Sequence, residues 1–303
     1  MSHILKLEEV TKSYSNHLAC DRVSFEMPKG CIFGLLGPNG AGKTSLIRII
    51  TTITRADSGA VYLDGEKLSS EHPSMIGYMP EERGLYKKMK VGDHLLYLAQ
   101  LKGYSSAKAK TEIKSWMDKF AISDWWDKKV EELSKGMQQK IQFIATVVHR
   151  PKLLILDEPF SGLDPINTNL IKDEIDELNA NGTSIIFSTH RMEQVEEICE
   201  RIVLINKGRN VLEGAVKDIK NQFKENLYRI EFTGQLPGDL AEKTNIIKTD
   251  SNAIVVQLDS EQQSNELLQH LLRSEVHIQA FNEILPTLNE IFIKQVGEPV
   301  VAV

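Results

Sequence analysis

Gly37-Pro38-Asn39-Gly40-Ala41-Gly42-Lys43-Thr44 fits the pattern G-x-x-x-x-G-K-[S/T] at every specified position. In this pattern the glycines let backbone N–H groups converge on phosphate oxygens, the lysine meets the β/γ-phosphate charge, and the Ser/Thr hydroxyl faces Mg²⁺. An apolar stretch, residues 31–36, precedes it, and a helical stretch, residues 44–52, follows. A tight surface turn with a solvated lysine would require neither the apolar stretch before it nor the helical stretch after it. The stretch therefore predicts a phosphate-binding loop in a strand–loop–helix unit.

A second stretch places two carboxylates at the end of an apolar strand. Residues 153–156 read Leu-Leu-Ile-Leu and run directly into Asp157 and Glu158. Adjacent side chains on a strand point in opposite directions, so the two acids can serve different purposes. Asp157 is suited to hold a metal ion and Glu158 to activate a water that attacks the γ-phosphate. On its own, such a pair more often ends a strand in a solvated turn, and the phosphate loop is what favours the catalytic interpretation.

The composition excludes several classes of protein. The chain has 303 residues, of which 41% are hydrophobic, and 36 Lys+Arg against 42 Asp+Glu give a formal net charge of −6. Proteins that neutralise a phosphate backbone usually carry a basic excess, so we expect no nucleic-acid partner. No apolar run approaches the roughly 20 residues that span a bilayer, and no secretory signal is apparent. Three cysteines without metal-ligand spacing suit a reducing cytosol, so we expect a cytoplasmic location.

The residue pattern changes twice along the chain. Short β runs and buried strands dominate residues 1–87 and 151–215, whereas helical periodicity dominates about residues 88–150. We therefore predict an α/β domain over residues 1–220, with a mixed sheet core and a helical insert, and a separate small α+β module over residues 221–303. In that module we expect strands at 227–232, 253–258 and 277–281 and helices at 264–272 and 285–294.

Taken in order, these motifs and three others resemble the ATP-binding cassette (ABC) ATPases over about residues 3–215. Residues 133–137, Leu-Ser-Lys-Gly-Met, resemble the signature loop of that family. Residues 161–164 resemble its D-loop and residues 188–190 its switch histidine, while Tyr14 matches the aromatic that stacks on adenine. The resemblance implies the P-loop NTPase fold of an ABC cassette, with ATP as nucleotide and Mg²⁺ as cofactor.

The resemblance also implies a role for each matching residue. The phosphates are expected at Gly37, Pro38, Asn39, Gly40, Ala41, Gly42, Lys43 and Thr44, and the adenine at Tyr14. Mg²⁺ is expected at Thr44, Asp157 and Glu81, where Glu81 replaces the glutamine of many relatives. Glu158 is expected to be the general base and His190 to bond the γ-phosphate. Ser134 and Gly136 are expected to act in trans, on the nucleotide of a second cassette, and Asp164 of the D-loop also at the nucleotide.

Two features refine the resemblance. The segment Met79-Pro80-Glu81-Glu82-Arg83-Gly84-Leu85-Tyr86 and the closing residues 285–292 resemble a bacterial branch of exporter ATPases, including the NatA-like sodium-extrusion type, with an added C-terminal domain. The signature carries Lys135 and Met137 where Gly and Gln are commoner. Trp116, Trp125 and Trp126 of the helical insert are either core residues or a docking patch for a membrane subunit.

These observations predict an ATP-hydrolysing subunit that dimerises on ATP and powers a separate transmembrane permease, with export as the expected direction. It would pair with itself or with a second ABC ATPase subunit, at the inner face of the membrane. The alternative is a soluble ABC ATPase that acts on ribosomes or DNA. Those relatives usually carry two cassettes or a long coiled coil, whereas this chain has one phosphate loop and an insert without sustained heptads.

The C-terminal module leaves two hypotheses open, stabilisation of a homodimer and regulation of the cassette. It holds six Lys/Arg against twelve Asp/Glu, so the whole acidic excess of the chain lies in its last 83 residues. Like charge would oppose direct packing of two such modules unless the acids lie at the rim of the contact.

Overall fold

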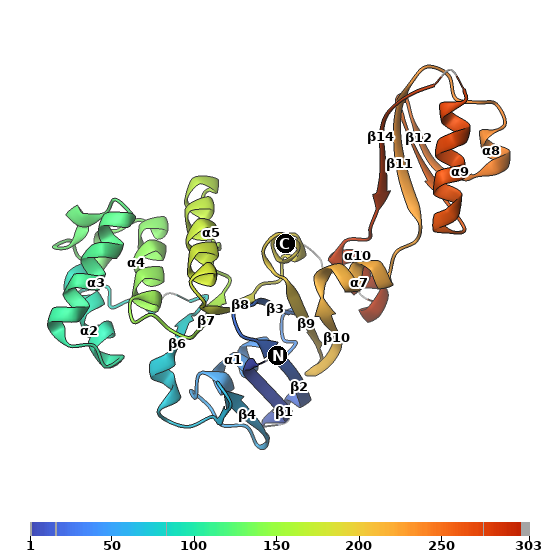
Figure 1. Ribbon diagram of the computed structural model, residues 1–303. Coiled ribbons are helices and arrows are strands. Elements are labelled where there is room, and N and C mark those ends of the chain that lie inside the picture. Colours follow the sequence, from blue (N-terminus) through green and yellow to red (C-terminus); the bar gives the residue numbers. More distant parts are fainter. Residues whose placement is uncertain (1, 16, 83, 275, 298–303) are drawn as a thin grey trace. The chain divides into compact units, whose positions relative to one another are not determined.

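The structure, a computed structural model, describes residues 2–15, 17–82, 84–274 and 276–297. The described chain forms two compact units, Met1–Ala215 and Val216–Val303 (Figure 1). The predicted boundary at residue 220 therefore falls inside α7 (Val216–Gln222), the first helix of the second unit.

Two sheets and the helix after the phosphate loop form the centre of the first unit. The antiparallel sheet contains, in spatial order, β2 (His17–Pro28), β1 (His3–Tyr14), β4 (Ser58–Leu63) and β5 (Glu66–Lys67). The six-stranded sheet contains β10 (Arg209–Ala215), β9 (Arg201–Asn206), β3 (Ile32–Leu36), β8 (Ser184–Ser188), β7 (Leu153–Asp157) and β6 (Ile76–Met79). The larger sheet is parallel except for β10, which makes it the mixed sheet that the sequence predicts.

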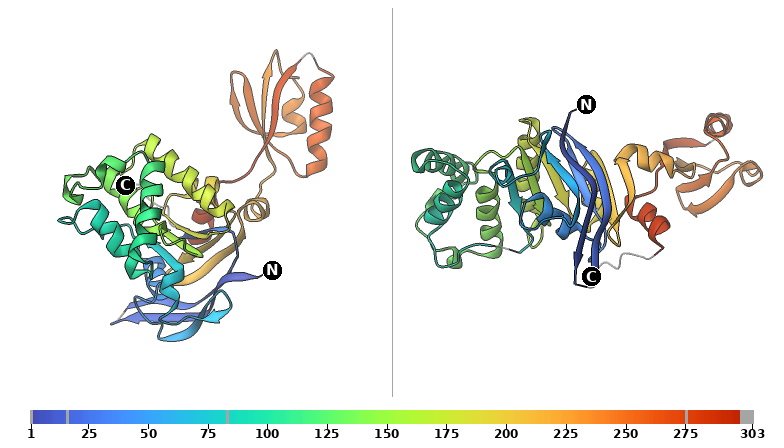
Figure 2. Two further views of the ribbon diagram at one scale, coloured as in Figure 1. Left: turned by 60° about the vertical axis from the view of Figure 1, so that its left-hand side comes forward. Right: turned by 90° about the horizontal axis from the view of Figure 1, so that it is seen from below.

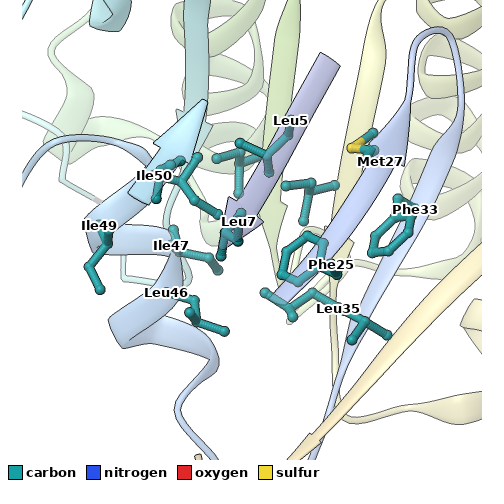
Figure 3. Packing of buried hydrophobic residues seen from close by; sticks show 14 of the residues in the cluster. Leu5, Leu7, Phe25, Met27, Phe33, Leu35, Leu46, Ile47, Ile49 and Ile50 are labelled. Atoms are coloured by element: carbon teal, nitrogen blue, oxygen red, sulfur yellow. The ribbon is translucent and has the colours of Figure 1, made fainter. Parts of the chain in front are cut away.

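The main core lies between the two sheets and α1 (Lys43–Ile50), as Figure 3 shows. Every residue of β3, β7 and β8 is buried, which explains why these strands read as continuous apolar runs. The Phe25 and Phe33 rings stack across the gap between the sheets with centroids 5.5 Å apart. This core fixes the ends of β3 and β7, from which the phosphate loop and the acidic pair emerge.

The helical insert lies between β6 and β7 in the chain (Figures 1 and 2). It contains α2 (Val91–Leu101), α3 (Ser106–Lys119) and α4 (Lys135–Val147), with short 3₁₀ turns η2 (Ser123–Trp125) and η3 (Val130–Glu132). Another 3₁₀ turn, η1 (His72–Met75), precedes β6. Helices α5 (Pro165–Ala180) and α6 (Met192–Ile198) then connect β7 to β8 and β8 to β9.

The second unit is an antiparallel sheet with helices, as predicted. Its strands, in spatial order, are β12 (Asn245–Asp250), β13 (Ala253–Gln257), β11 (Leu227–Thr233) and β14 (His277–Ile284). Its helices are α7, α8 (Leu240–Lys243), α9 (Glu261–Leu272) and α10 (Leu288–Val296). The predicted helix at 285–294 begins three residues later, because Thr287 caps α10 in a capping box with Glu290.

Candidate active site

The phosphate loop has a backbone that glycine permits. Gly42, the N-cap of α1, has φ 113°, and Gly40 has φ 77°, both in the left-handed region. A Cβ on Gly42 would lie 2.3 Å from the carbonyl oxygen of Ala19, and one on Gly37 would lie 2.1 Å from that of Ile205. The loop is therefore packed closely against its neighbours on one side while its other side lines a cavity.

Lys43 is held inside this loop. Its Nζ donates to the carbonyl oxygens of Gly37 at 2.6 Å and Pro38 at 3.2 Å. Burial lowers the pKa of Lys43, and the nearby carboxylates of Asp157, Glu158 and Glu81 act in the opposite direction. A partly desolvated cation close to backbone N–H groups is suited to bind a polyphosphate.

Asp157 ends β7 as a buried carboxyl. Ser188, at the end of the neighbouring strand β8, donates its hydroxyl to Asp157 Oδ1 at 2.8 Å. Burial raises the pKa of Asp157, while the Ser188 hydrogen bond and the Lys43 charge lower it and Glu158 raises it further. Burial destabilises the ionised form of this carboxyl, and a nearby cation would strongly stabilise it. A metal ligand is expected to have this property.

Glu158 has a different environment from its neighbour. Its backbone is left-handed, with φ 51°, and its N–H donates to the Ser188 carbonyl at 2.8 Å. Its Oε1 accepts the backbone N–H of His190 at 2.8 Å and lies 2.7 Å from His190 Nδ1, while Oε2 accepts the Thr189 hydroxyl at 3.0 Å. Three donors from the end of β8 thus fix this carboxylate, whose side chain is only 13% exposed.

These groups share one cavity of about 260 Å³. It is lined by Tyr14, His17, Ala19, Asn39, Gly40, Ala41, Gly42, Lys43, Thr44, Ser45, Glu81, Asp157, Glu158 and His190. The structure therefore brings together most of the residues that the sequence singles out, from β1, α1, β7 and the loops after β6 and β8. Gly37 and Pro38 are not in its lining, although their carbonyl groups hold Lys43.

Two residues at the edges of the cavity come from separate elements. Tyr14 ends β1 and is 40% exposed, with the Lys12 ammonium 5.5 Å from its ring centroid. Glu81 follows β6, and its position is supported by Gln142 of α4, which donates to the Pro80 carbonyl at 2.8 Å. Arg83 of the same segment lies outside the described residues.

Ser134, Gly136 and Asp164 lie elsewhere. None of them lines the cavity that holds Lys43. Ser134 caps α4 by accepting the Met137 N–H, and Asp164 caps α5 by accepting the Asn167 N–H at 3.0 Å. A Cβ on Gly136 would lie 3.9 Å from the Asn167 side chain, so the starts of α4 and α5 adjoin. These residues form a second group at two helix N-termini.

Several residues that shape the site carry no predicted role. His17, Ala19 and Ser45 line the cavity, and Ser188 and Thr189 hold the two acids. The motif at 188–190 pointed to this strand end, but the sequence singled out only its histidine. The partner of each hydroxyl depends on β7 and β8 being neighbours, which the chain order does not reveal.

Comparisons with known proteins agree with this geometry. A family described as "ABC transporter" matches residues 20–161, and one described as "ATP-binding protein DrrA1-3-like, C-terminal domain" matches residues 214–296. The uncharacterized ABC transporter ATP-binding protein YhaQ of Bacillus subtilis is 43% identical over 296 residues, which cover 97% of this chain and 99% of YhaQ. The chain belongs to the ABC transporter family.

Other relatives place the chain within the family. The daunorubicin/doxorubicin resistance ATP-binding protein DrrA of Streptomyces peucetius is 29% identical over 96% of this chain and 91% of its own length. A solved structure of an ABC transporter ATP-binding subunit is 29% identical, with a TM-score of 0.68 over 73% of this chain and 93% of its own. This ABC protein is thus the ATP-binding ATPase subunit of a transporter, and the relatives do not favour the ribosome- or DNA-directed alternative. In the described part of the ABC chain, no helix is both long and apolar enough to cross a bilayer.

Proposed function

We propose that this ABC subunit powers an exporter: two cassettes close on ATP, and hydrolysis of that ATP drives a separate membrane-spanning permease. The observation that supports this most is the placement of Glu158, fixed by three donors beside the phosphate loop. Drug-resistance relatives such as DrrA support export as the direction. The cassette would then work on the cytoplasmic face of the membrane.

The residues in the cavity fit Mg²⁺. Thr44 offers a hydroxyl, and Asp157 and Glu81 offer carboxylates, of which Asp157 is buried and its pKa raised. Among the described residues no group of three or more His, Cys, Asp or Glu side chains could hold a metal unaided. Mg²⁺ normally takes one or two carboxylates together with phosphate oxygens and water, so this donor set is sufficient. The ion would neutralise charge on the β- and γ-phosphates.

Each of these residues then has a separate role in ATP hydrolysis. Lys43 and the 39–44 amides hold the phosphates, and Tyr14 stacks on the adenine. Glu158 accepts a proton from the water that attacks the γ-phosphate, and His190 bonds that phosphate. Glu158 Oε1 already holds the His190 ring, so the base and the phosphate ligand are positioned as one pair.

Ser134 and Gly136 complete the site of a second subunit in this proposal. They lie outside the cavity of their own chain, at the start of α4, where N–H groups and the helix dipole favour a phosphate. Asp164 caps the adjoining α5 and is proposed to lie at the nucleotide as well. The second subunit is another copy of this chain or a different ABC ATPase subunit. Contacts to the γ-phosphate that exist only in the closed pair give ATP its preference for that state.

An exposed apolar patch is the proposed contact for the permease. Tyr86, Tyr97 and Leu101, here called the Tyr86 patch, are 50%, 42% and 64% exposed. The Tyr86 and Tyr97 rings meet edge to face, 5.8 Å apart. Tyr86 follows Glu81 by five residues, so a partner bound at this patch would lie close in the chain to a group of the nucleotide cavity.

The test of this function uses Glu158→Gln in the purified protein. Removing the base should lower turnover by about 10²-fold or more while ATP binding persists, so a nucleotide-bound dimer should accumulate in gel filtration. Glu66→Gln, a change at an exposed residue of β5 that does not line the cavity, is the matched control and should keep its turnover. Unimpaired hydrolysis by Glu158→Gln would overturn the assigned base, and membrane purification without a multi-span partner would overturn the transport role.

A further inference from the structure

Charge is unevenly distributed within the first unit. Residues 87–150, essentially the helical insert, contain thirteen Lys/Arg and seven Asp/Glu, a formal net charge of +6. The rest of the first unit contains fifteen Lys/Arg and twenty-two Asp/Glu, a net charge of −7. A chain that is acidic as a whole therefore has one strongly basic part.

Lysines of this insert gather along two neighbouring segments and one helix. The segment 87–92 runs beside 126–131, because the N–H groups of Val91 and Gly92 donate to the carbonyls of Lys128 and Trp126, both at 2.9 Å. Trp126 in turn lines a surface hollow of about 450 Å³ together with Lys110 and Lys114 of α3. We call Lys87, Lys88, Lys110, Lys114 and Lys128 the lysine surface.

The ammonium groups of the lysine surface are free to bind an anion. Among the residues that the structure describes, none of these five lysines forms an ion pair. Two carboxylates also line the hollow, but Asp118 accepts the Ser123 hydroxyl and Asp127 pairs with Lys90 at 2.9 Å. The Lys110 Nζ lies 6.0 Å from the centroid of the half-buried Trp126 indole. The surface thus offers unpaired cations around an accessible aromatic ring.

The position of this surface indicates what covers it. Lys87 and Lys88 directly follow Tyr86, so the lysine surface begins where the Tyr86 patch ends. A permease bound at that patch emerges from a bilayer whose cytoplasmic leaflet is anionic. Lysines near such a leaflet are attracted within about one Debye length, roughly 10 Å at 0.1 M salt, and tryptophan is enriched at the lipid–water interface.

We propose that the lysine surface binds the phosphate headgroups of anionic membrane lipids. The inference rests on the proposed function in placing the subunit at a membrane and the permease at the Tyr86 patch. It gives the insert a second contact, with lipid, beside its contact with the permease. A nucleic acid is the other polyanion such lysines attract, but the continuity with the Tyr86 patch favours lipid.

The test measures lipid binding without a permease. The full chain is floated with vesicles of phosphatidylcholine alone or with about one third phosphatidylglycerol, at low and high salt. Binding is expected only with phosphatidylglycerol and is expected to fall as salt rises. Equal binding to both vesicles, or none to either, would overturn the proposal.

Variants assign the effect to the lysine surface. Lys110→Gln, Lys114→Gln and Lys128→Gln together should weaken vesicle binding at least about tenfold. The matched control changes Lys67, Lys217 and Lys248, three exposed lysines outside the insert, to Gln and should bind as the parent does. An equal loss in the control, or tighter binding of duplex DNA than of vesicles through the same lysines, would refute it. ATPase activity is measured in parallel, since its loss bears on the proposed function and not on lipid binding.

Discussion

The environments of Asp157 and Glu158 both depend on residues at the end of β8. Asp157 and Glu158 follow one another, yet burial and the Ser188 hydroxyl govern the first, while Thr189 and His190 hold the second. The left-handed backbone of Glu158 turns its side chain toward that strand end. From the sequence, both acids and His190 were predictable as site residues because their motifs are local. The bonds between them were not, because they join residues more than thirty positions apart.

A buried histidine in the insert should make stability depend on pH. His94 is fully buried, and neither ring nitrogen has a partner among the described residues. Burial lowers the pKa of His94 to about 4 from 6.5. The unfolded chain therefore binds a proton that the folded chain excludes, so stability is full above pH 6.5 and falls as the pH drops toward 4. At pH 5 the loss is about 2 kcal/mol.

Replacing this residue tests the prediction. His94→Leu should reduce the fall in unfolding free energy between pH 7.5 and pH 5 by about 2 kcal/mol. Urea unfolding followed by tryptophan fluorescence reports on the insert, because all three tryptophans lie in it. His277→Asn, in the second unit, is the control. An unchanged pH dependence in His94→Leu would contradict the account.

At the scale of elements, the predictable strands are those buried on both faces. β3, β7 and β8 read as apolar runs, whereas β12 is half-exposed to exposed throughout and exists through its pairing with β13. β1 runs from His3 to Tyr14, past register shifts that break the alternation of its buried and exposed residues. Tertiary pairing, which local sequence does not encode, decides such strands.

One lysine joins the insert to the sheet. The Lys102 Nζ, just after α2, donates to the carbonyls of Pro73 at 2.6 Å and Ile76 at 2.9 Å. Lys102→Met removes both bonds and leaves two carbonyls without that donor, so we expect a loss of about 2–3 kcal/mol in the unfolding free energy of the insert. Urea unfolding measures it, with faster amide exchange near residues 73–76 as a second readout. Lys128→Met should stay within about 0.5 kcal/mol, and a similar loss there would show that the effect is not specific.

At the scale of the whole molecule, the nucleotide cavity needs only the first unit. Every residue in its lining precedes Ala215, and the second unit has its own core of Ile230, Ile254, Val256, Leu271 and neighbours. A chain ending at Ala215 should therefore bind ATP within about twofold of the full chain in an equilibrium titration. A tenfold loss would mean that the second unit contributes to the cavity. Unchanged ATP-dependent dimerisation of the shortened chain would exclude dimer stabilisation as the role of the second unit.

The bond between His190 and Glu158 has a consequence for how the His190 ring can bind a phosphate. An ionised carboxylate can only accept, so His190 Nδ1, 2.7 Å from Glu158 Oε1, must carry a hydrogen. In an uncharged ring, Nε2 would then be an acceptor, and it could not bond a phosphate oxygen that also only accepts. The proposed bond to the γ-phosphate therefore needs a ring that donates at both nitrogens. Glu158 and the γ-phosphate would then accept from opposite edges of one imidazole, so the acid that activates the water and the phosphate that the water attacks would be linked through a single side chain.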